Sequence, residues 1–321
     1  MSTTEVRDEP YHANGIPPPN LDLPYPDSPG EITASLLKLT ELAPNPRTRF
    51  VFKNLISKLH EFISETNITT EEWRSGIEFL TSLNEALTPG PRGQELNLLS
   101  DAFGVTALLE RLNNPRIGNA TESSALGPFF TEDAPDFLFG ESIASEGIGE
   151  YMFVEGRVLT TGGEPIPGAV IETWEAFGTG LYDIQNAERT GPECRGRLRT
   201  DEEGKYGYRA IVPVPYAIPE DDPVCRLLQS LGRPAVQSGH VHVIVHAPGF
   251  HKLVTMLYPE DDPYFSTSVA QGVKKSLIVK LTEIDDETDA RKRGFQKGTK
   301  FKLLNYDFVL LTEDEWAGAR T

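Results

Sequence analysis

The spacing of hydrophobic residues changes once, near residue 145, and this change most limits the fold that the chain can adopt. From about 31 to 115, apolar residues recur every three or four positions, which is typical of amphipathic helices. After about 145, short alternating segments are separated by Gly, Pro and Asp, which is typical of strands. We therefore predict an α+β fold with segregated parts, in which helices precede an antiparallel β-sandwich.

These patterns divide the sequence into three predicted parts. Residues 1–30 form a proline-rich N-terminal arm, 31–145 a helical part, and 146–321 the β-sandwich. The helical part contains an amphipathic run from Phe52 to Ile63, a helix that begins after the N-cap Thr69, and a helical pattern from Gly93 to Asn113. The predicted strands are Tyr151–Val158, Ala169–Trp174, Tyr206–Val212, Val241–His246, Lys275–Leu281 and Asp307–Leu311.

Composition and charge argue against several classes of protein. The two cysteines, Cys194 and Cys225, lack the paired spacing of a zinc module or a disulfide scaffold. A formal net charge of -18 argues against a nucleic-acid partner, since a surface that binds phosphates needs clustered Lys and Arg. No apolar stretch is long enough to cross a membrane, and the acidic, polar N-terminus does not match a signal peptide. We therefore expect a cytoplasmic protein.

His240-Val241-His242 is the most specific local pattern in the chain. Side chains alternate along a strand with a period of two, so both imidazoles leave the same face and lie close together. Such a pair suits a borderline metal ion. The alternative is a pair of half-exposed histidines that bind nothing. His246 shares the same face, but like His12, His60 and His251 it is better explained as a structural residue than as a ligand.

A metal site on this pair needs further ligands, and two kinds are open. An oxygen-activating iron(II) site takes a carboxylate with two histidines, but no acidic residue has a sequence spacing from the pair that marks it as the third ligand. Phenolates are the other kind, because iron(III) favours anionic oxygen donors. Tyr182 lies in a glycine-containing loop directly after the strand that ends at Trp174, and Tyr216 lies in a stretch that prolines stiffen. Tyrosines in such loops also serve simply as packing residues.

A resemblance to a known family favours the phenolates. The span from Glu31 to Leu311 resembles the intradiol ring-cleavage dioxygenases, and within them most of all the hydroxyquinol and catechol 1,2-dioxygenases. The motifs that carry it follow in the family's order: Glu122-Ser123-Ser124-Ala125-Leu126-Gly127-Pro128-Phe129-Phe130, Trp174-Glu175-Ala176, Gly180-Leu181-Tyr182-Asp183-Ile184-Gln185, Gly196-Arg197-Leu198-Arg199, Pro213-Val214-Pro215-Tyr216 and His240-Val241-His242.

The resemblance implies one non-haem Fe(III) per subunit, bound by Tyr182, Tyr216, His240 and His242. It implies that Tyr216 and His242 are axial ligands, and that Tyr216 is also catalytic because it takes a proton from the diol and leaves the metal. It further implies that a catechol-type diol, either hydroxyquinol or a substituted catechol, reacts with dioxygen. The ring opens between the two oxygenated carbons to give maleylacetate or a muconate-type diacid.

The same resemblance implies a substrate pocket and a quaternary structure. It assigns the N-terminal helices to a homodimer interface, with a lipid in an apolar tunnel. The residues that it places at the substrate pocket are Leu98, Asp101, Gly127, Pro128, Phe129 and Ile184. Core packing is the alternative for the helix near Leu98 and Asp101 and for the Gly127-Pro128-Phe129-Phe130 segment.

Two positions depart from the family pattern. Gln237 stands three residues before His240, where the family usually has an arginine, and Met256 stands where many relatives have glutamine or histidine. Both are predicted to touch the substrate, and Gln237 is predicted to affect catalysis. An uncharged glutamine cannot supply the electrostatic contribution of an arginine. One alternative is therefore an iron-binding family member with altered or little turnover, and another is a metal-free interaction module.

Overall fold

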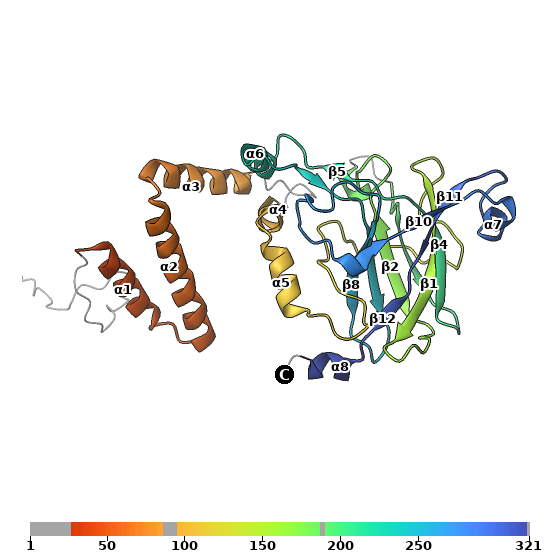
Figure 1. Ribbon diagram of the computed structural model, residues 1–321, viewed down its shortest axis with the longest axis horizontal. Coiled ribbons are helices and arrows are strands. Elements are labelled where there is room, and N and C mark those ends of the chain that lie inside the picture. Colours follow the sequence, from red (N-terminus) through yellow and green to blue (C-terminus); the bar gives the residue numbers. More distant parts are fainter. Residues whose placement is uncertain (1–26, 86–94, 187–189, 320–321) are drawn as a thin grey trace, which may run out of the picture. The chain divides into compact units, whose positions relative to one another are not determined.

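The computed structural model describes residues 27–85, 95–186 and 190–319 (Figure 1). The predicted arm up to residue 26, including His12, lies outside this range. The chain divides into two compact units, 1–78 and 79–321, which are described separately. The predicted division into arm, helical part and catalytic part at 30/31 and 145/146 stays a prediction.

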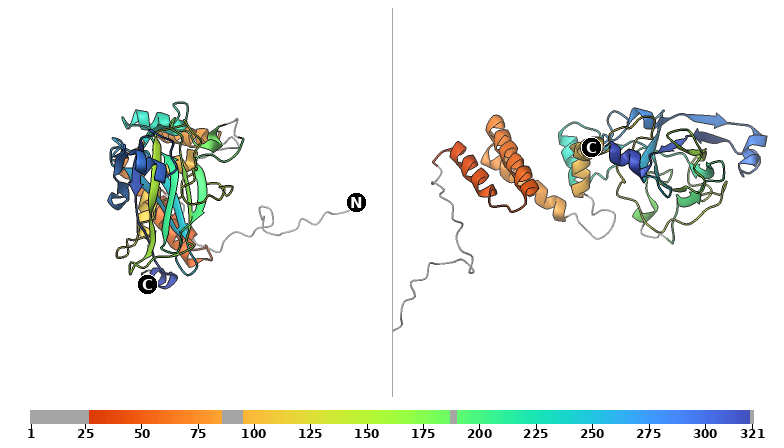
Figure 2. Two further views of the ribbon diagram at one scale, coloured as in Figure 1. Left: turned by 90° about the vertical axis from the view of Figure 1, so that its right-hand side faces the viewer. Right: turned by 90° about the horizontal axis from the view of Figure 1, so that it is seen from below.

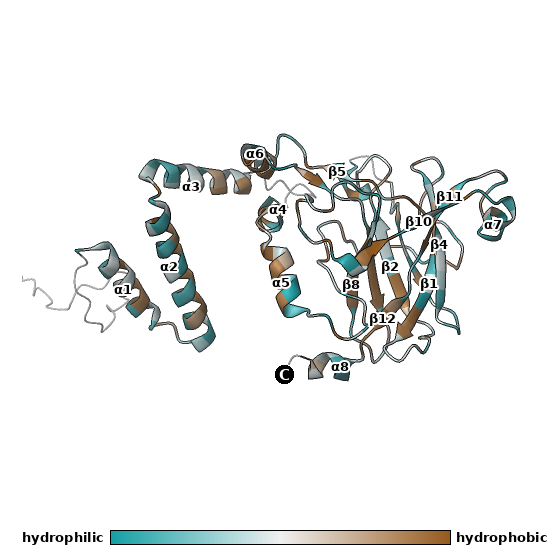
Figure 3. Cartoon of the chain, viewed as in Figure 1, coloured by the Kyte–Doolittle hydropathy of each residue, from teal (hydrophilic) through white to brown (hydrophobic). Residues whose placement is uncertain are grey.

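The first unit contains α1 (Pro29–Thr40), α2 (Pro46–Thr66) and the beginning of α3 (Thr70–Glu85). Ser28 and Asn45 cap α1 and α2 with their side chains, and a proline follows each cap, where its missing N–H is not needed. Thr69 and Glu72 bond reciprocally at the start of α3, as the sequence predicted for a helix N-terminus. Hydrophobic and hydrophilic residues alternate around α2 (Figure 3), yet none of its side chains is buried.

The helical pattern predicted from Gly93 to Asn113 forms two helices within the described residues. α4 (Glu95–Ala102) and α5 (Val105–Asn113) are separated at Gly104, whose φ of 69° is left-handed and ends the helical path. The hydrophobic spacing continues across this break, so periodicity alone did not show it. Glycine adopts this conformation without steric cost, so the break falls at this residue.

The second unit holds two five-stranded sheets (Figures 1 and 2). One has the order β10-β11-β1-β12, with β4 also paired to β1, and the other has the order β3-β2-β7-β8-β9. The first sheet consists of β1 (Tyr151–Thr160), β4 (Lys205–Ile211), β10 (Leu281–Ile284), β11 (Phe301–Asn305) and β12 (Phe308–Leu310). The second consists of β2 (Val170–Glu175), β3 (Arg195–Arg199), β7 (Val241–His246), β8 (Leu253–Pro259) and β9 (Ile278–Val279).

The sheets are mixed, which corrects the prediction of an antiparallel sandwich. β1 runs parallel to β11 and β12, and β8 runs parallel to β9, whereas the remaining pairs in these sheets are antiparallel. At Gly156 the carbonyl oxygen of Tyr306 approaches so closely that a Cβ there would lie 1.8 Å from it. A glycine is therefore required where the C-terminal segment passes from β11 to β12 along the edge of β1.

The core lies between the two sheets. It joins side chains of β1 and β4 with the inward-facing residues of the second sheet, among them Ile171, Val243 and Leu257. Shorter elements complete the unit: the β5 (Tyr216–Ala217) and β6 (Val236–Gln237) pair, α6 (Pro223–Ser230), α7 (Glu287–Lys292) and α8 (Glu313–Gly318). None of the helices among the described residues has the length and apolarity needed to span a membrane.

Candidate metal centre

His240 and His242 project from the face of the second sheet that points away from the core. Val241, Val243 and Val245 of β7 pack into the core between the sheets, and the alternation of a strand sends the histidines to the opposite face. β7 lies between β2 and β8, so His242 has Trp174 on one side and Met256 on the other. The Trp174 indole stacks on the His242 ring, with centroids 4.5 Å apart and planes 6° apart.

Two tyrosines complete a cluster of four donor groups with these histidines. Tyr182 Oη lies 3.3 Å from His240 Nε2 and 3.1 Å from His242 Nε2, and the two Nε2 atoms lie 2.9 Å apart. Tyr216 meets the Tyr182 ring edge-on, with centroids 5.9 Å apart, and the two hydroxyls are hydrogen-bonded. The structure thus brings together all four side chains that the sequence predicted as metal ligands.

Each tyrosine is held by local backbone structure. Tyr182 precedes the 3₁₀ turn η2 (Asp183–Gln185), and its N–H donates to Gln185 Oε1 at 2.8 Å. Tyr216 opens β5, where it pairs directly with Gln237 of β6. Tyr182 is fully buried, and the Phe129 ring stacks on it with centroids 4.3 Å apart.

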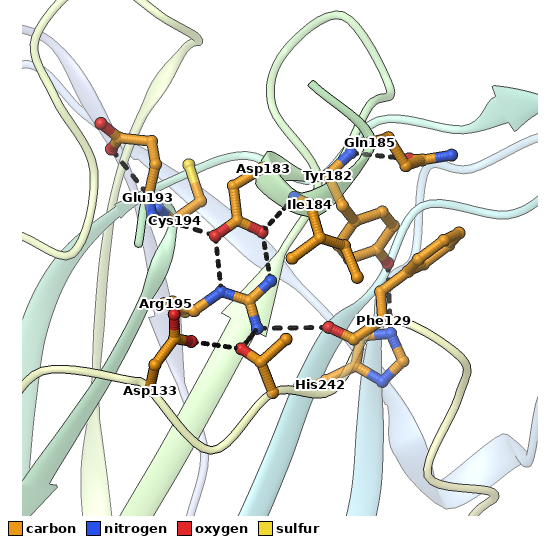
Figure 4. A network of polar contacts seen from close by, with 11 residues as sticks. Phe129, Asp133, Tyr182, Asp183, Ile184, Gln185, Glu193, Cys194, Arg195 and His242 are labelled. Carbon is orange, nitrogen blue, oxygen red and sulfur yellow. Dashed lines mark hydrogen bonds and ion pairs between the residues drawn. The ribbon is translucent and has the colours of Figure 1, made fainter. Parts of the chain in front are cut away.

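A buried ion pair fixes the loop that carries Tyr182 (Figure 4). Arg195 Nε donates to Asp183 Oδ2 at 2.8 Å, and a second nitrogen of the guanidinium bonds Asp183 Oδ1. Arg195 Nη1 also donates to the carbonyl oxygen of Phe129 at 3.2 Å and to Thr131 Oγ1 at 2.8 Å. Removing one partner of such a pair costs about 3–5 kcal/mol, because the other charge is left buried and unpaired. One guanidinium therefore holds both the Tyr182 loop and the Phe129 segment.

The protonation states of the two histidines and two tyrosines suit a site that binds a cation. Burial lowers the pKa of His240 below its ordinary range, and the pKa of His242 further still, so both rings are neutral at neutral pH. Burial also raises the pKa of Tyr182 and of Tyr216, so without a cation both remain phenols. His240 Nδ1 lies 2.8 Å from the carbonyl oxygen of Ser238, which places the ring proton on Nδ1 and leaves Nε2 free as a ligand.

The arrangement fits a metal ion held by phenolates and imidazoles. Donor atoms that share one ion at about 2 Å lie about 3 Å from one another, as these do. Within the described ranges, no group of three or more His, Cys, Asp and Glu side chains is placed to hold a metal ion. Tyr182 and its hydrogen-bonded neighbour Tyr216 are oxygen donors that lie beside the histidine pair.

The predicted pocket residues lie at different depths around this cluster. A Cβ at Gly127 would lie 2.6 Å from His242 Cε1, so only glycine lets this segment pass over the histidine. Asp101 is half-buried. Burial is the main cause of the raised pKa of Tyr216, and the charge of Asp101 raises this pKa further. The other predicted residues are the buried Phe129 and Met256, the half-buried Leu98, Ile184 and Gln237, and the exposed Pro128.

The segment before β9 anchors the side-chain oxygen of Gln237. Its Oε1 accepts hydrogen bonds from Ser268 Oγ at 3.0 Å and from the N–H of Ala270 at 3.3 Å. Arg233, the nearest preceding arginine, donates to the carbonyl oxygen of Ala102 at 2.6 Å. The guanidinium of Arg233 is thus engaged at the end of α4, while the position of the family arginine carries an anchored, uncharged amide.

Several residues of the site were not found from the sequence. Asp183 lies within the Gly180–Gln185 motif, and Arg195 directly precedes the Gly196–Arg199 motif. Nothing in the sequence showed that these two residues form a buried ion pair. Tyr258 lies beside His240, with ring centroids 5.7 Å apart, and belongs to a strand that was not predicted. The sequence signal that could have identified Tyr258 is its position two residues after Met256, because side chains two residues apart lie on the same face of a strand.

Comparisons with known proteins identify the family to which this chain belongs. A family model described as "Dioxygenase" matches residues 127–312, and one described as "Catechol dioxygenase N terminus" matches 45–121. The chain is 38% identical to an intradiol ring-cleavage dioxygenase of Aspergillus niger, over 90% of this chain and 86% of that protein. It is 39% identical to a hydroxyquinol 1,2-dioxygenase of a Rhizobium species, over 83% of this chain and 90% of that protein.

Solved structures show the same relationship. The hydroxyquinol 1,2-dioxygenase of Pseudomonas putida DLL-E4 superimposes with a TM-score of 0.83 at 36% identity, covering 89% of this chain and 99% of that chain. The catechol 1,2-dioxygenase of Acinetobacter radioresistens gives a TM-score of 0.78 at 28% identity, covering 90% and 95%. The chain belongs to the intradiol ring-cleavage dioxygenases, a family of non-haem iron enzymes.

Glu175 is a buried carboxyl on the core face of the same strand that carries Trp174. Its Oε1 accepts a hydrogen bond from the N–H of Ile211 at 3.0 Å, and its Oε2 has no partner among the described residues. Burial raises its pKa from 4.5 to about 8, so the folded protein holds this group as a neutral acid at neutral pH.

Glu175→Gln should therefore flatten the pH dependence of stability. Between pH 4.5 and about 8 the folded wild-type protein keeps a proton that the unfolded chain releases, so its free energy of unfolding falls as pH rises through this window. The glutamine variant has no such proton, and its advantage over wild type should grow by a few kcal/mol, roughly, from pH 5 to pH 8. Urea unfolding at several pH values measures this, and parallel curves for both proteins would contradict it.

Proposed function

We propose that the protein cleaves hydroxyquinol, or a substituted catechol, between its two hydroxylated carbons, at an iron(III) ion held by Tyr182, Tyr216, His240 and His242. The observation that carries this proposal is the cluster of Tyr182 Oη, His240 Nε2 and His242 Nε2 within 2.9–3.3 Å of one another in a buried site. The diol and dioxygen combine without loss of atoms, so catechol gives a muconate-type diacid and hydroxyquinol gives maleylacetate. The substrate itself supplies the electrons.

Iron(III), when bound, would polarise the diol oxygens, lower their pKa and draw electron density from the ring. The protein must then accept a proton from the diol. We assign this role to Tyr216, because a phenol buried away from water favours its protonated form once it no longer bonds a cation. Phe129 and Trp174, stacked on Tyr182 and His242, exclude water around the donor groups.

Hydroxyquinol is favoured over catechol by the position of Asp101. Asp101 is half-buried, and after burial its charge contributes to the raised pKa of Tyr216, so the carboxyl is within electrostatic range of that donor group. A carboxyl at the edge of an apolar pocket can bond a third ring hydroxyl, which catechol lacks. The curated relatives include several enzymes named hydroxyquinol 1,2-dioxygenase, at 37–39% identity, and a catechol 1,2-dioxygenase of Candida albicans at 33%.

The N-terminal helices are proposed to form a homodimer interface. The first unit leaves large apolar side chains uncovered, including Phe50, Phe52 and Leu55, which are 58%, 49% and 56% exposed. A second copy of this chain is the proposed partner, since exposed apolar surface of this kind marks association sites. A bound lipid stays a prediction of the family resemblance.

Iron content and oxygen uptake test the proposal together. We expect about one iron per chain, a visible charge-transfer colour, and faster oxygen uptake with hydroxyquinol than with catechol. His242→Ala should lose most of the iron and the activity. His246→Ala is the matched control, because His246 lies on the same strand but is exposed. A colourless protein that binds no iron when refolded with it would contradict the proposal, and a coloured protein without oxygen uptake would favour the iron-binding alternative.

Gln237→Arg tests whether the uncharged residue at this position sets the rate or substrate preference. The variant places a positive charge opposite Tyr216 and removes the acceptor of Ser268 and Ala270. We expect turnover to change by about tenfold or more for at least one of the two diols, because a buried charge alters transition-state electrostatics by roughly this amount. Steady-state kinetics with both diols measures it. Equal kcat and equal preference in an iron-loaded variant would show that Gln237 has no catalytic role.

A further inference from the structure

Tyr258 occupies the position next to His240 on the metal-binding face of the second sheet. In the register of β7 and β8, His242 pairs with Met256 and Val241 with Leu257. Continuing this register by one residue places Tyr258 opposite His240, and the ring centroids of the two lie 5.7 Å apart. Because side chains two residues apart share a face, Tyr258 and Met256 border the same site from β8.

The hydroxyl of Tyr258 is buried with a weak partner. The side chain is 1% exposed, and its Oη donates to the Met256 sulfur at 3.2 Å. A thioether sulfur accepts hydrogen bonds poorly. Burial raises the pKa of Tyr258, so at neutral pH the group is a donor and carries no charge.

Other buried tyrosines of the second unit show how a structural hydroxyl is satisfied. Tyr206 donates to the carbonyl oxygen of Tyr306 at 2.7 Å, and Tyr208 donates to Thr173 Oγ1 at 3.1 Å. Both lie on β4 of the first sheet and bond oxygen. Tyr258 has sulfur instead, and it faces the donor cluster. A hydroxyl in this state gains a stronger bond when an oxygen acceptor arrives.

We propose that Tyr258 is a substrate-binding residue, whose hydroxyl leaves the Met256 sulfur and donates a hydrogen bond to one of the two adjacent oxygens of the bound diol. The proposal rests on the proposed function, since it needs a diol held at the four donor groups. An anionic diol oxygen is a far better acceptor than a thioether, so the exchange is favourable. Both hydroxyquinol and catechol carry these two oxygens, whereas only hydroxyquinol carries the third hydroxyl assigned to Asp101.

The proposal also accounts for how a site without the family arginine can hold its substrate. Gln237 has its side-chain oxygen engaged by Ser268 and Ala270, and Arg233 is engaged at Ala102. Neither presents a free charge to the diol. Tyr258 supplies a neutral donor from the neighbouring strand instead.

The test is anaerobic binding of each diol to the full-length, iron-loaded protein, followed by the visible charge-transfer absorbance. Tyr258→Phe should raise the Kd of catechol and of hydroxyquinol alike, by about tenfold, with iron content and the diol-free spectrum unchanged. Tyr206→Phe is the matched control: it removes one buried hydroxyl, which bonds the carbonyl oxygen of Tyr306, and both Kd values should stay within about twofold of wild type.

Three results would overturn the proposal. The first is a Tyr258→Phe variant that loads iron and binds both diols as tightly as wild type. The second is an effect on hydroxyquinol alone, which would place the contact at the third hydroxyl. The third result concerns a second variant, which is needed if Tyr258→Phe loses iron. Met256→Leu removes the sulfur that competes for the Tyr258 hydroxyl, so it should lower both Kd values. Unchanged or higher Kd values for Met256→Leu would contradict the proposal. If wild type itself neither binds iron nor cleaves a diol, the proposed function fails, independently of Tyr258.

Discussion

The register of β7 between β2 and β8 determines which side chains can meet at the centre. Trp174, His242 and Met256 stand in one row across the three strands, and His240 and Tyr258 stand in the next. A shift of one residue would turn every side chain of β7 to the other face, which would bury the histidines in the core and expose Val241 and Val243 to the loops. The valines that fill the space between the sheets therefore fix the register, and the register places the imidazoles.

The loops that close the site depend on this sheet and on one another. Gly127 passes over His242 at a distance that excludes any side chain, and Phe129 then covers Tyr182. Arg195 of β3 bonds both Asp183 and the carbonyl oxygen of Phe129, so the strand edge, the Tyr182 loop and the covering segment are joined through one cation. The loop before η2 and the short strand β5 supply the two phenols, whereas β7 and the residue before it supply the two imidazoles, and β3 supplies the charge that orders the Tyr182 loop.

Much of this arrangement could be predicted from local patterns, and the rest depends on contacts that are distant in the sequence. The alternation in Val241–His246 placed both histidines on one face without any knowledge of the partner strands, and the strand has these bounds in the structure. β3 was missed because the residues that alternate with its three arginines are Gly196 and Leu198, which give only one large apolar side chain. β8 was missed because it is nearly continuously apolar. The parallel pairing of β1 with β11 joins segments about 150 residues apart, and no local signal fixes its direction.

The same distinction applies to individual site residues. Family motifs named Tyr182 and Tyr216, while spacing alone left packing as an alternative. The bonds of Gln237 to Ser268 and Ala270 and the partner of Tyr258 depend on how β5, β6, β8 and the segment before β9 meet, which the sequence does not reveal. Glu175 shows a further limit, because its raised pKa arises from burial between two sheets and not from any neighbour in the chain.

The central claim is that two tyrosinates and two imidazoles bind one iron ion. Resonance Raman spectroscopy of the iron-loaded protein, excited in its visible charge-transfer band, tests this most directly because it enhances only vibrations of groups bonded to the metal. We expect phenolate ring vibrations from two tyrosines, one set of which disappears in Tyr182→Phe and the other in Tyr216→Phe. A spectrum without phenolate vibrations, or one that neither substitution changes, would contradict the account.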